Sequence, residues 1–366
     1  MLTPQMQIPQ FYCPIQCKIH PAWRDVDESS VRWLLRYFGE DAETRRYATG
    51  RMGMLAAMAA PQAIADRLQI YADFLMWLAV FDDGVIEEGD QATRPRELAA
   101  RLRILLRVAE APEFSRADDP VAESLRDIRR RLGNCASATQ TARWVSAMRG
   151  YFFDQVYRAH LCVSRTIPTL EDYTLLRIYD TSMGVDVAML DIISGYEITG
   201  SEVESAGFRA LSELTCLLVG WDNDIISYQK EKTRAPSGQN VIDVLVKERN
   251  ISLDEALMVA MRLRDRLMHR FVTLRDQIQP NASAPALHYL QDLASWIVGN
   301  LEWGMRSNRY RKISNGDFAF TVDEPARHRS AAVPADLVDG PLDFPAISWW
   351  WQPELATGGS GSPIGA

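Results

Sequence analysis

Cysteine is scarce in this sequence, and a long uninterrupted apolar run is absent. The five cysteines among 366 residues are an odd number and are scattered along the chain. A disulfide framework is therefore disfavoured, and we expect a reducing, cytoplasmic location. No run of about 18 apolar residues occurs, so we expect no membrane-spanning helix. The first twelve residues lack the basic and apolar regions of a signal peptide.

An excess of positive charge is also missing. Lys and Arg number 40 against 48 Asp and Glu, which gives a net charge of −8. Nucleic acids and anionic membranes select for excess Lys and Arg, so we expect neither as a partner. An anionic ligand would need a local positive site or bound metal ions. The hydrophobic content of 47% is that of a globular protein with a sizeable core.

Proline is absent from residues 121–167, 169–235 and 286–324. Those stretches carry apolar residues three and four positions apart, which predicts long helices, and the alternation expected of strands is nearly absent. We therefore predict an all-α fold with one domain. Its expected parts are an extended arm over 1–24, a helical domain over 25–312, a loop with an aromatic segment that packs on the domain over 313–355, and a flexible tail over 356–366.

Two adjacent carboxylates follow a stretch that is apolar on every helical face. Residues 74–81 (FLMWLAVF) predict a buried helix, and Asp82, Asp83 and Glu87 come next. Asp82 lies seven residues after Leu75 and so continues the same stripe. Carboxylates at the end of a buried helix cost free energy unless a cation compensates them. Oxygen ligands at this density suit Mg²⁺ or Mn²⁺, and a solvated acidic helix end is the alternative.

The same arrangement of acids recurs at Asp118, Asp119 and Glu123. This copy follows a polar stretch, and Pro120 comes directly after the two aspartates. These are features of a helix N-cap and first turn. We therefore interpret the second copy as structural.

A second polar constellation lies on one predicted helix. Asn223, Ser227 and Glu231 are spaced four residues apart, so an amide, a hydroxyl and a carboxylate share one stripe. Upstream, residues 214–221 are apolar nearly all round. Three oxygen ligands on one stripe could chelate a divalent cation; polar residues on a helix surface are the alternative.

With both constellations in place, the sequence resembles the bacterial class I terpene cyclases. Residues 82–87 resemble their aspartate-rich motif, with the last acid one position later than in the simplest form, and residues 223–231 (NDIISYQKE) fit the motif NDxxSxxxE in full. Arg177 lies 46 residues before Asn223, where the family has a diphosphate-sensing arginine, and Arg309 with Tyr310 matches a C-terminal RY pair. The resemblance covers nearly the whole chain and is closest to selinadiene-synthase-like sesquiterpene cyclases.

The resemblance implies a helical bundle around an apolar cavity with three Mg²⁺ ions at its mouth. It implies metal ligands at Asp82, Asp83, Glu87, Asn223, Ser227 and Glu231, and diphosphate ligands at Arg177, Lys230, Arg309 and Tyr310. Asp83 could instead neighbour the ligands, and Glu87 could touch metal or only orient its neighbours. Arg177, Asp180 and Thr181 would act as sensor, linker and effector of diphosphate binding.

The implied substrate is a linear prenyl diphosphate, farnesyl diphosphate first. Geranylgeranyl diphosphate is the alternative substrate and would need a deeper pocket. A non-catalytic helical protein that binds prenyl diphosphates is the alternative of a different class. A chain-elongating prenyltransferase would carry two aspartate-rich motifs and is disfavoured. Relatives often form homodimers, although nothing in this sequence requires one.

Ionisation of such a substrate leaves an allylic carbocation, which apolar and aromatic walls must shield from water. The aromatic candidates for these walls are Phe74, Trp77, Phe81, Phe152, Phe153 and Trp303. Ordinary core packing is the alternative for each.

Overall fold

The computed structural model describes residues 7–87, 89–113, 119–234, 238–307, 309–310 and 328–357. Nearly all regular structure in these ranges is helical, which confirms the predicted all-α class. The longer helices are α1 (Trp23–Phe38), α2 (Ala42–Ala48), α3 (Met52–Ala59), α4 (Ala65–Phe81), α5 (Pro95–Glu110), α6 (Pro120–Gly133), α7 (Ala138–Ser164), α8 (Leu170–Tyr179), α12 (Ala206–Arg234), α13 (Val241–Arg249), α14 (Leu253–Ile278) and α15 (Ala284–Arg306).

Short elements connect and extend these helices. The short α-helices are α9 (Met183–Val187), α10 (Leu190–Ser194), α11 (Gly200–Val203) and α16 (Pro345–Ser348). A π-helical turn, η1 (Asp82–Glu87), continues α4. The 3₁₀ turns are η2 (Asp90–Thr93), η3 (Gln279–Asn281), η4 (Trp349–Trp351) and η5 (Pro353–Thr357). Two-residue strands β1 (Phe11–Tyr12) and β2 (Arg329–Ser330) form a parallel pair.

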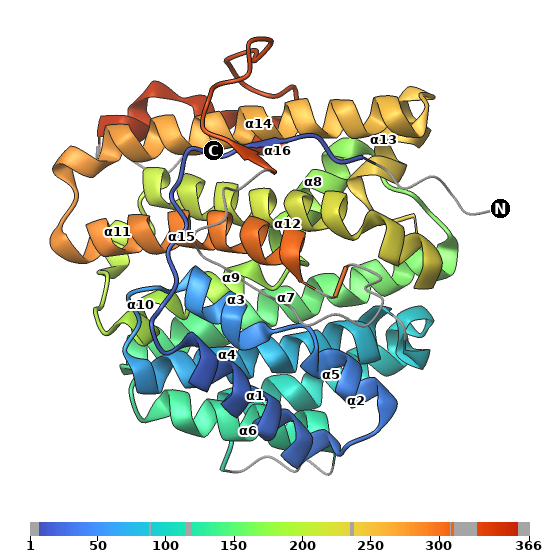
Figure 1. Ribbon diagram of the computed structural model, residues 1–366, viewed down its shortest axis with the longest axis vertical. Helices are drawn as coiled ribbons and strands as arrows, with labels where there is room; N and C mark the ends of the chain where they lie inside the picture. Colours follow the sequence, from blue (N-terminus) through green and yellow to red (C-terminus); the bar gives the residue numbers. More distant parts are fainter. Residues whose placement is uncertain are drawn as a thin grey trace.

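The long helices lie side by side across the molecule, with α14 at the top of Figure 1, α6 at the bottom and α12 between them. α12 packs against α8, α14 and α15, while α4 packs against α1, α3 and α6. Every residue from Ile70 to Phe81 on α4 is buried, which confirms the buried helix predicted from its uniformly apolar sequence. Burial on all faces fixes the position of whatever follows the helix.

Segments from both ends of the described chain pack on this bundle. Phe11 and Trp350 have no exposed surface. The Trp350 indole N–H donates to Glu213 of α12 at 2.9 Å, and Arg270 of α14 donates to the Trp350 carbonyl at 2.7 Å. Residues 313–327 of the predicted loop and 358–366 of the predicted tail lie outside the described residues, and the predicted domain boundaries stay predictions.

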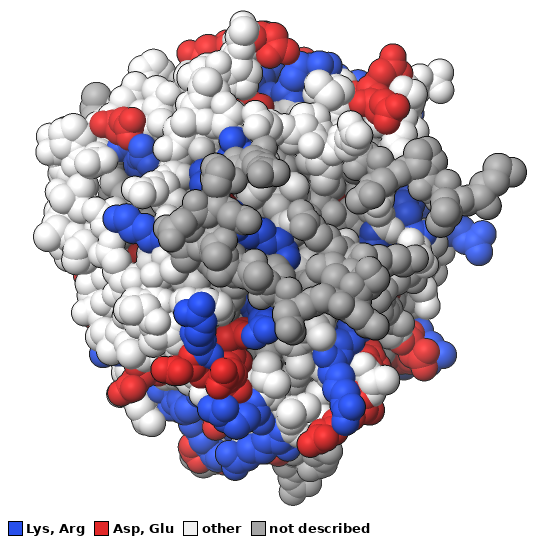
Figure 2. Space-filling view, in the orientation of Figure 1, with Lys and Arg blue, Asp and Glu red and all other residues white. Residues whose placement is uncertain are grey.

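Two further observations concern the surface charge and the hydropathy of the described residues. On the face shown in Figure 2, Lys and Arg are interspersed with Asp and Glu rather than gathered into one broad basic area. Among the described helices, none is long and apolar enough to cross a bilayer.

Candidate active site

The end of α4 carries the first acidic cluster into a pocket. η1 follows α4 directly, and wider helical turns of this kind recur at functional sites. A side chain at Gly89 would overlap the carbonyl oxygen of Gly84, so glycine permits the close approach that ends the turn. Asp82 and Glu87 line the pocket, and Asp83 lies outside its lining.

The two lining acids contact residues of α7. Burial raises the pKa of Asp82 to about 7, and a hydrogen bond from the Tyr151 hydroxyl opposes that rise. Glu87 accepts a hydrogen bond from Arg158 at 3.0 Å. A carboxyl with a raised pKa faces too little positive charge to offset its lost hydration. The Asp82 carboxylate would therefore gain from an added cation.

Asp83 is surrounded by basic side chains instead. Its carboxylate lies 2.8 Å from Arg309, 3.0 Å from Lys230 and 3.6 Å from Arg46. Burial opposes its ionisation, but Arg309 and next Lys230 outweigh burial and hold its pKa below the usual range. These contacts position two predicted diphosphate ligands, and a direct bond from Asp83 to metal stays a prediction.

The second cluster lies on α12. Asn223, Ser227 and Glu231 all line the same pocket. The Asn223 amide N–H donates to the Tyr310 hydroxyl at 2.8 Å, which leaves the amide oxygen available to a ligand. Ser227 donates to Glu231, and Asn240 donates to the other Glu231 oxygen at 3.0 Å. Burial raises the pKa of Glu231 to about 7, with smaller contributions from two other acids.

Asp224, the remaining acid of this segment, also lines the pocket, and protein groups hydrogen-bond both of its carboxylate oxygens. It accepts hydrogen bonds from the Tyr173 hydroxyl at 2.6 Å and from the Val241 backbone N–H at 3.0 Å. Arg177 donates to its other oxygen at 2.8 Å. Asp224 thus fixes α8 and the start of α13 against α12 and orients the guanidinium of Arg177.

A break in the helical structure follows Arg177. α8 ends at Tyr179 and α9 starts at Met183, with Ser182 in the left-handed region at φ 61°. Arg177 donates to Asp180 at 2.9 Å, and Asp180 and Thr181 line the pocket inside this break. The break therefore lies just before Gly184, which is itself part of α9.

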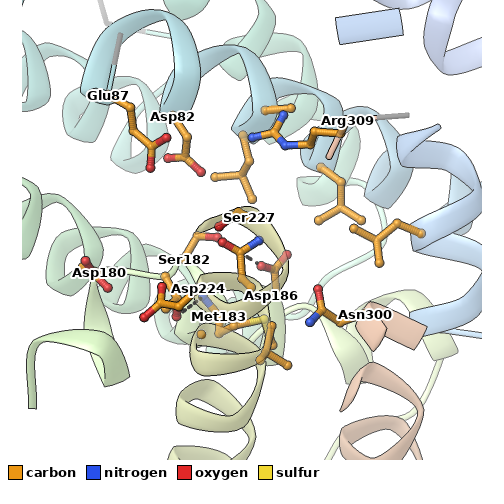
Figure 3. Close-up of a pocket in the computed structure, with 18 of the residues that line it drawn as sticks. Asp82, Glu87, Asp180, Ser182, Met183, Asp186, Asp224, Ser227, Asn300 and Arg309 are labelled. Atoms are coloured by element: carbon orange, nitrogen blue, oxygen red, sulfur yellow. Dashed lines mark hydrogen bonds between the residues drawn. The ribbon is translucent and has the colours of Figure 1, made fainter. Parts of the chain in front are cut away.

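The pocket encloses about 960 Å³ of space, its open mouth included. Apolar side chains from three helices also line it, namely Leu75 and Leu78 of α4, Val219 of α12 and Trp296 of α15. Figure 3 shows Asp82, Glu87 and Arg309 across the pocket from Ser227 and Asp224. The predicted site residues that line it are Asp82, Glu87, Arg177, Asp180, Thr181, Asn223, Ser227, Lys230, Glu231, Trp303, Arg309 and Tyr310.

Five of the six aromatic residues predicted to form the pocket walls do not line this pocket. Phe153 is 75% exposed on α7, because it lies on the solvent face of that helix. Phe74, Trp77 and Phe81 stack on one another on the side of α4 away from the pocket, and Trp77 donates to the Val121 carbonyl of α6 at 2.8 Å.

Phe152 packs against Phe81 at 5.8 Å between ring centroids and does not line the pocket either. Trp303 does line it, and Trp296 is an aromatic wall residue that sequence reasoning missed. Tyr151 and Arg158 were missed as well, although their seven-residue spacing puts them on one face of α7 and could have indicated a polar stripe.

With this geometry, comparison with known proteins becomes informative. Residues 73–270 match the family model described as terpene synthase family 2, C-terminal metal binding. That range contains both polar clusters and Arg177. The chain belongs to the terpene synthase family. The family resemblance drawn from the sequence motifs is confirmed.

Relatives and solved structures cover nearly the whole chain of this terpene synthase. It is 32% identical over 348 residues to (+)-(1(10)E,4E,6S,7R)-germacradien-6-ol synthase of Streptomyces pratensis. The matched region covers 94% of this chain and 96% of the relative. It is 32% identical over 373 residues to the (2E,6E)-farnesyl diphosphate cyclizing (+)-T-muurolol synthase of Streptomyces clavuligerus, covering 97% of this chain and 85% of the relative. A crystal structure of the SVS_A2 protein, from ancestral sequence reconstruction, matches at a TM-score of 0.83 and 30% identity over 95% of this chain and 100% of that one.

The donor set in the pocket fits the divalent metal that the family description implies. Asp82 and Glu231 are carboxyls whose pKa burial raises to about 7, and a cation would compensate their buried charge. Asn223 and Ser227 add neutral oxygens, a ligand type that hard cations such as Mg²⁺ prefer. Within the described ranges, no three His, Cys, Asp or Glu side chains could hold an ion by themselves.

Proposed function

We propose that this terpene synthase ionises and cyclises a linear prenyl diphosphate, farnesyl diphosphate first, in a Mg²⁺-dependent reaction that releases diphosphate. The observation that carries the proposal is that the two polar clusters and the four predicted diphosphate ligands share one pocket, which apolar side chains also line. The relative from Streptomyces clavuligerus, whose name specifies farnesyl diphosphate, supports the choice of substrate.

We assign the metal ligands to the two polar clusters. Asp82 and Glu87 would serve on one side, Asn223, Ser227 and Glu231 on the other, and Asp83 beside them, with three Mg²⁺ ions expected. When bound, the ions supply Lewis-acid stabilisation of the departing diphosphate. The chain's own contribution at this end is to hold acceptor oxygens on opposite sides of one anion.

The basic side chains bind and orient the diphosphate. Arg309 and Lys230 are fixed on Asp83 at 2.8 and 3.0 Å, and the Tyr310 hydroxyl is fixed by Asn223. Charge-assisted hydrogen bonds from such preset donors hold an anion in one pose. Arg177 contributes from the other side, where its Nε has no partner among the described residues.

The helix break between α8 and α9 would couple diphosphate binding to the rest of the pocket. Arg177 contacts Asp180, whose backbone carbonyl accepts a hydrogen bond from Gln155 at 2.8 Å. A diphosphate that attracts Arg177 would shift Asp180, and with it the backbone near Thr181. Leu75, Leu78 and Val219 exclude water from the cation that forms.

Incubation with Mg²⁺ and each of farnesyl and geranylgeranyl diphosphate tests the proposal, with released diphosphate and hydrocarbon or alcohol products as readouts. We expect turnover of farnesyl diphosphate to a cyclic C15 product. Exclusive turnover of geranylgeranyl diphosphate would identify a diterpene cyclase. Binding of either substrate without diphosphate release would favour a non-catalytic binding protein. The predicted homodimer and cytoplasmic location stay predictions.

A further inference from the structure

Two buried polar atoms of pocket-lining residues have no partner among the described residues. They are Oδ1 of Asp186 on α9 and Nδ2 of Asn300 on α15. Asp186 is 1% exposed and Asn300 is 4% exposed, and both line the pocket. In Figure 3 both lie away from Asp82 and Glu87. A buried donor or acceptor left unpaired costs free energy, so a ligand that pairs with both would be favoured.

The Asp186 carboxyl is held from behind. Ser182, at the left-handed position of the helix break, donates to Oδ2 at 3.3 Å. The Tyr71 hydroxyl of α4 also hydrogen-bonds the carboxyl, and Tyr71 itself accepts from the Trp296 indole at 2.5 Å. These contacts stabilise the ionised carboxylate and leave Oδ1 as its free acceptor in the pocket.

The chemistry of the two atoms selects the ligand. Oδ1 of a carboxylate needs a donor and Nδ2 of an amide needs an acceptor. A hydrocarbon chain offers neither, whereas one water molecule offers both. Leu75, Met183 and Val219 line the same pocket, so a water held by these two groups would share the pocket with apolar side chains.

We propose that Asp186 and Asn300 hold the water molecule that ends the cyclisation, and that the product is therefore a terpene alcohol. This inference rests on the proposed function. It assigns Asp186 as the base of the final step and Asn300 as the group that positions the water oxygen.

The step balances without any further reactant. A lone pair of the water oxygen forms the new C–O bond to the cationic carbon. One O–H bond of that water breaks, and its proton passes to the Asp186 carboxylate. The positive carbon and the negative carboxylate thus become a neutral alcohol and a neutral acid.

The surroundings of Asp186 support this role. Burial raises the pKa of Asp186 well above its usual range, and the Ser182 and Tyr71 hydrogen bonds only partly oppose it. The carboxylate is accordingly a stronger base than an exposed aspartate. A carbocation nearby favours the ionised form, because opposite charges attract strongly where water is excluded.

The test is turnover of farnesyl diphosphate with Mg²⁺ in ¹⁸O-labelled water, followed by mass spectrometry of the products. We expect wild type to make mainly an alcohol that carries ¹⁸O. Asp186→Leu and Asn300→Leu should each lower the ratio of alcohol to hydrocarbon at least about tenfold, since a positioned base contributes that much or more. Diphosphate release should persist in both variants.

A matched control comes from α15. Asp292 is a buried acid on the same helix as Asn300, does not line the pocket and is bonded to Tyr196 and Ser194. Asp292→Asn should leave the product ratio unchanged. Circular dichroism shows whether the leucine variants fold. If they do not, Asp186→Asn gives the same prediction, because it keeps the shape of the side chain but cannot take the proton.

The outcomes separate this inference from the proposed function. Turnover to hydrocarbon alone, or an alcohol without ¹⁸O, would overturn the inference and leave the cyclase function standing. An unchanged alcohol share in the Asp186 and Asn300 variants would overturn it too, as would loss of diphosphate release in folded Asp186→Asn. Absence of turnover with every prenyl diphosphate would overturn both.

Discussion

Two segments of this chain share one pattern of acids and differ in everything around it. Asp82, Asp83 and Glu87 follow a helix that is buried on all faces, and two of them line the pocket. Asp119 instead caps α6, accepting from the backbone N–H groups of Val121 and Ala122.

The rest of the second segment behaves like an ordinary helix start. Glu123 pairs with Arg126 in the first turn of α6, which confirms the structural interpretation of this copy, and Asp118 lies outside the described residues. The comparison shows that the burial of the preceding helix, rather than the string of acids, decides whether carboxylates face a cavity. At an exposed helix start the backbone N–H groups already satisfy the carboxylate.

The largest difference between the segments should appear in turnover. Asp82→Ala should lower kcat/KM for farnesyl diphosphate by at least about 100-fold, because it removes a carboxylate that we propose as a metal ligand beside the diphosphate. Asp119→Ala should leave turnover nearly unchanged and lower the free energy of unfolding by about 1 kcal/mol through loss of the N-cap. Steady-state kinetics and thermal unfolding of both variants measure this. Equal activity losses would contradict the distinction.

The third acid of each pattern sharpens the same comparison. Glu87→Gln should lower kcat/KM about tenfold and raise the Mg²⁺ concentration needed for half-maximal turnover, because a carboxylate that we propose as a metal ligand loses its charge. Glu123→Gln should change neither quantity. An unchanged Mg²⁺ requirement in Glu87→Gln would show that Glu87 only orients Arg158.

Stability of the metal-free protein should depend on pH through the first segment. The folded-state pKa of Asp82 is raised to about 7, above the usual value near 4 of an unfolded chain. Its contribution to stability is therefore fully present below about pH 4 and is lost as pH rises toward 7, on the order of 1 kcal/mol per pH unit.

Denaturant unfolding in the presence of a chelator checks this dependence. Asp82→Asn should flatten the decline between about pH 4 and 7, and saturating Mg²⁺ should reduce it in wild type. A steeper decline in Asp82→Asn than in wild type would contradict the burial of this carboxyl.

The smallest effects should come from two predicted pocket aromatics, one that lines the pocket and one that is exposed. Trp303→Leu should alter the product distribution while diphosphate release continues, because Trp303 lines the pocket. Phe153→Leu should alter neither, since Phe153 is exposed. Gas chromatography of the products reports both. A changed profile in Phe153→Leu would place that residue near the substrate.

The helical class and the two polar clusters could be predicted from the sequence because each has a periodic signal. The wall aromatics could have been sorted by the same signal. Asp82 shares its stripe with Leu75, and that stripe faces the pocket, whereas Phe74 and Trp77 occupy the opposite face of α4. The prediction selected aromatic residues by type and not by the helix face that they occupy, so most of them do not line the pocket.

Other features left no local signal. The break before α9 depends on the left-handed conformation of Ser182, which composition does not specify. Asp186 and Asn300 are single polar residues in apolar surroundings, and only the packing of α9 and α15 shows that they face one cavity. The sequence around Asp83 gives no sign of the three basic side chains that surround it, because they come from distant segments.

The central claim is that Asp82 on one wall and Glu231 on the other jointly hold metal and diphosphate. Calorimetric titration of inorganic diphosphate into the protein, with and without Mg²⁺, tests it most directly. The account predicts tight binding only with Mg²⁺, lost in both Asp82→Ala and Glu231→Ala and kept in Asp119→Ala. Mg²⁺-dependent binding of wild-type strength in either of the first two variants would contradict it.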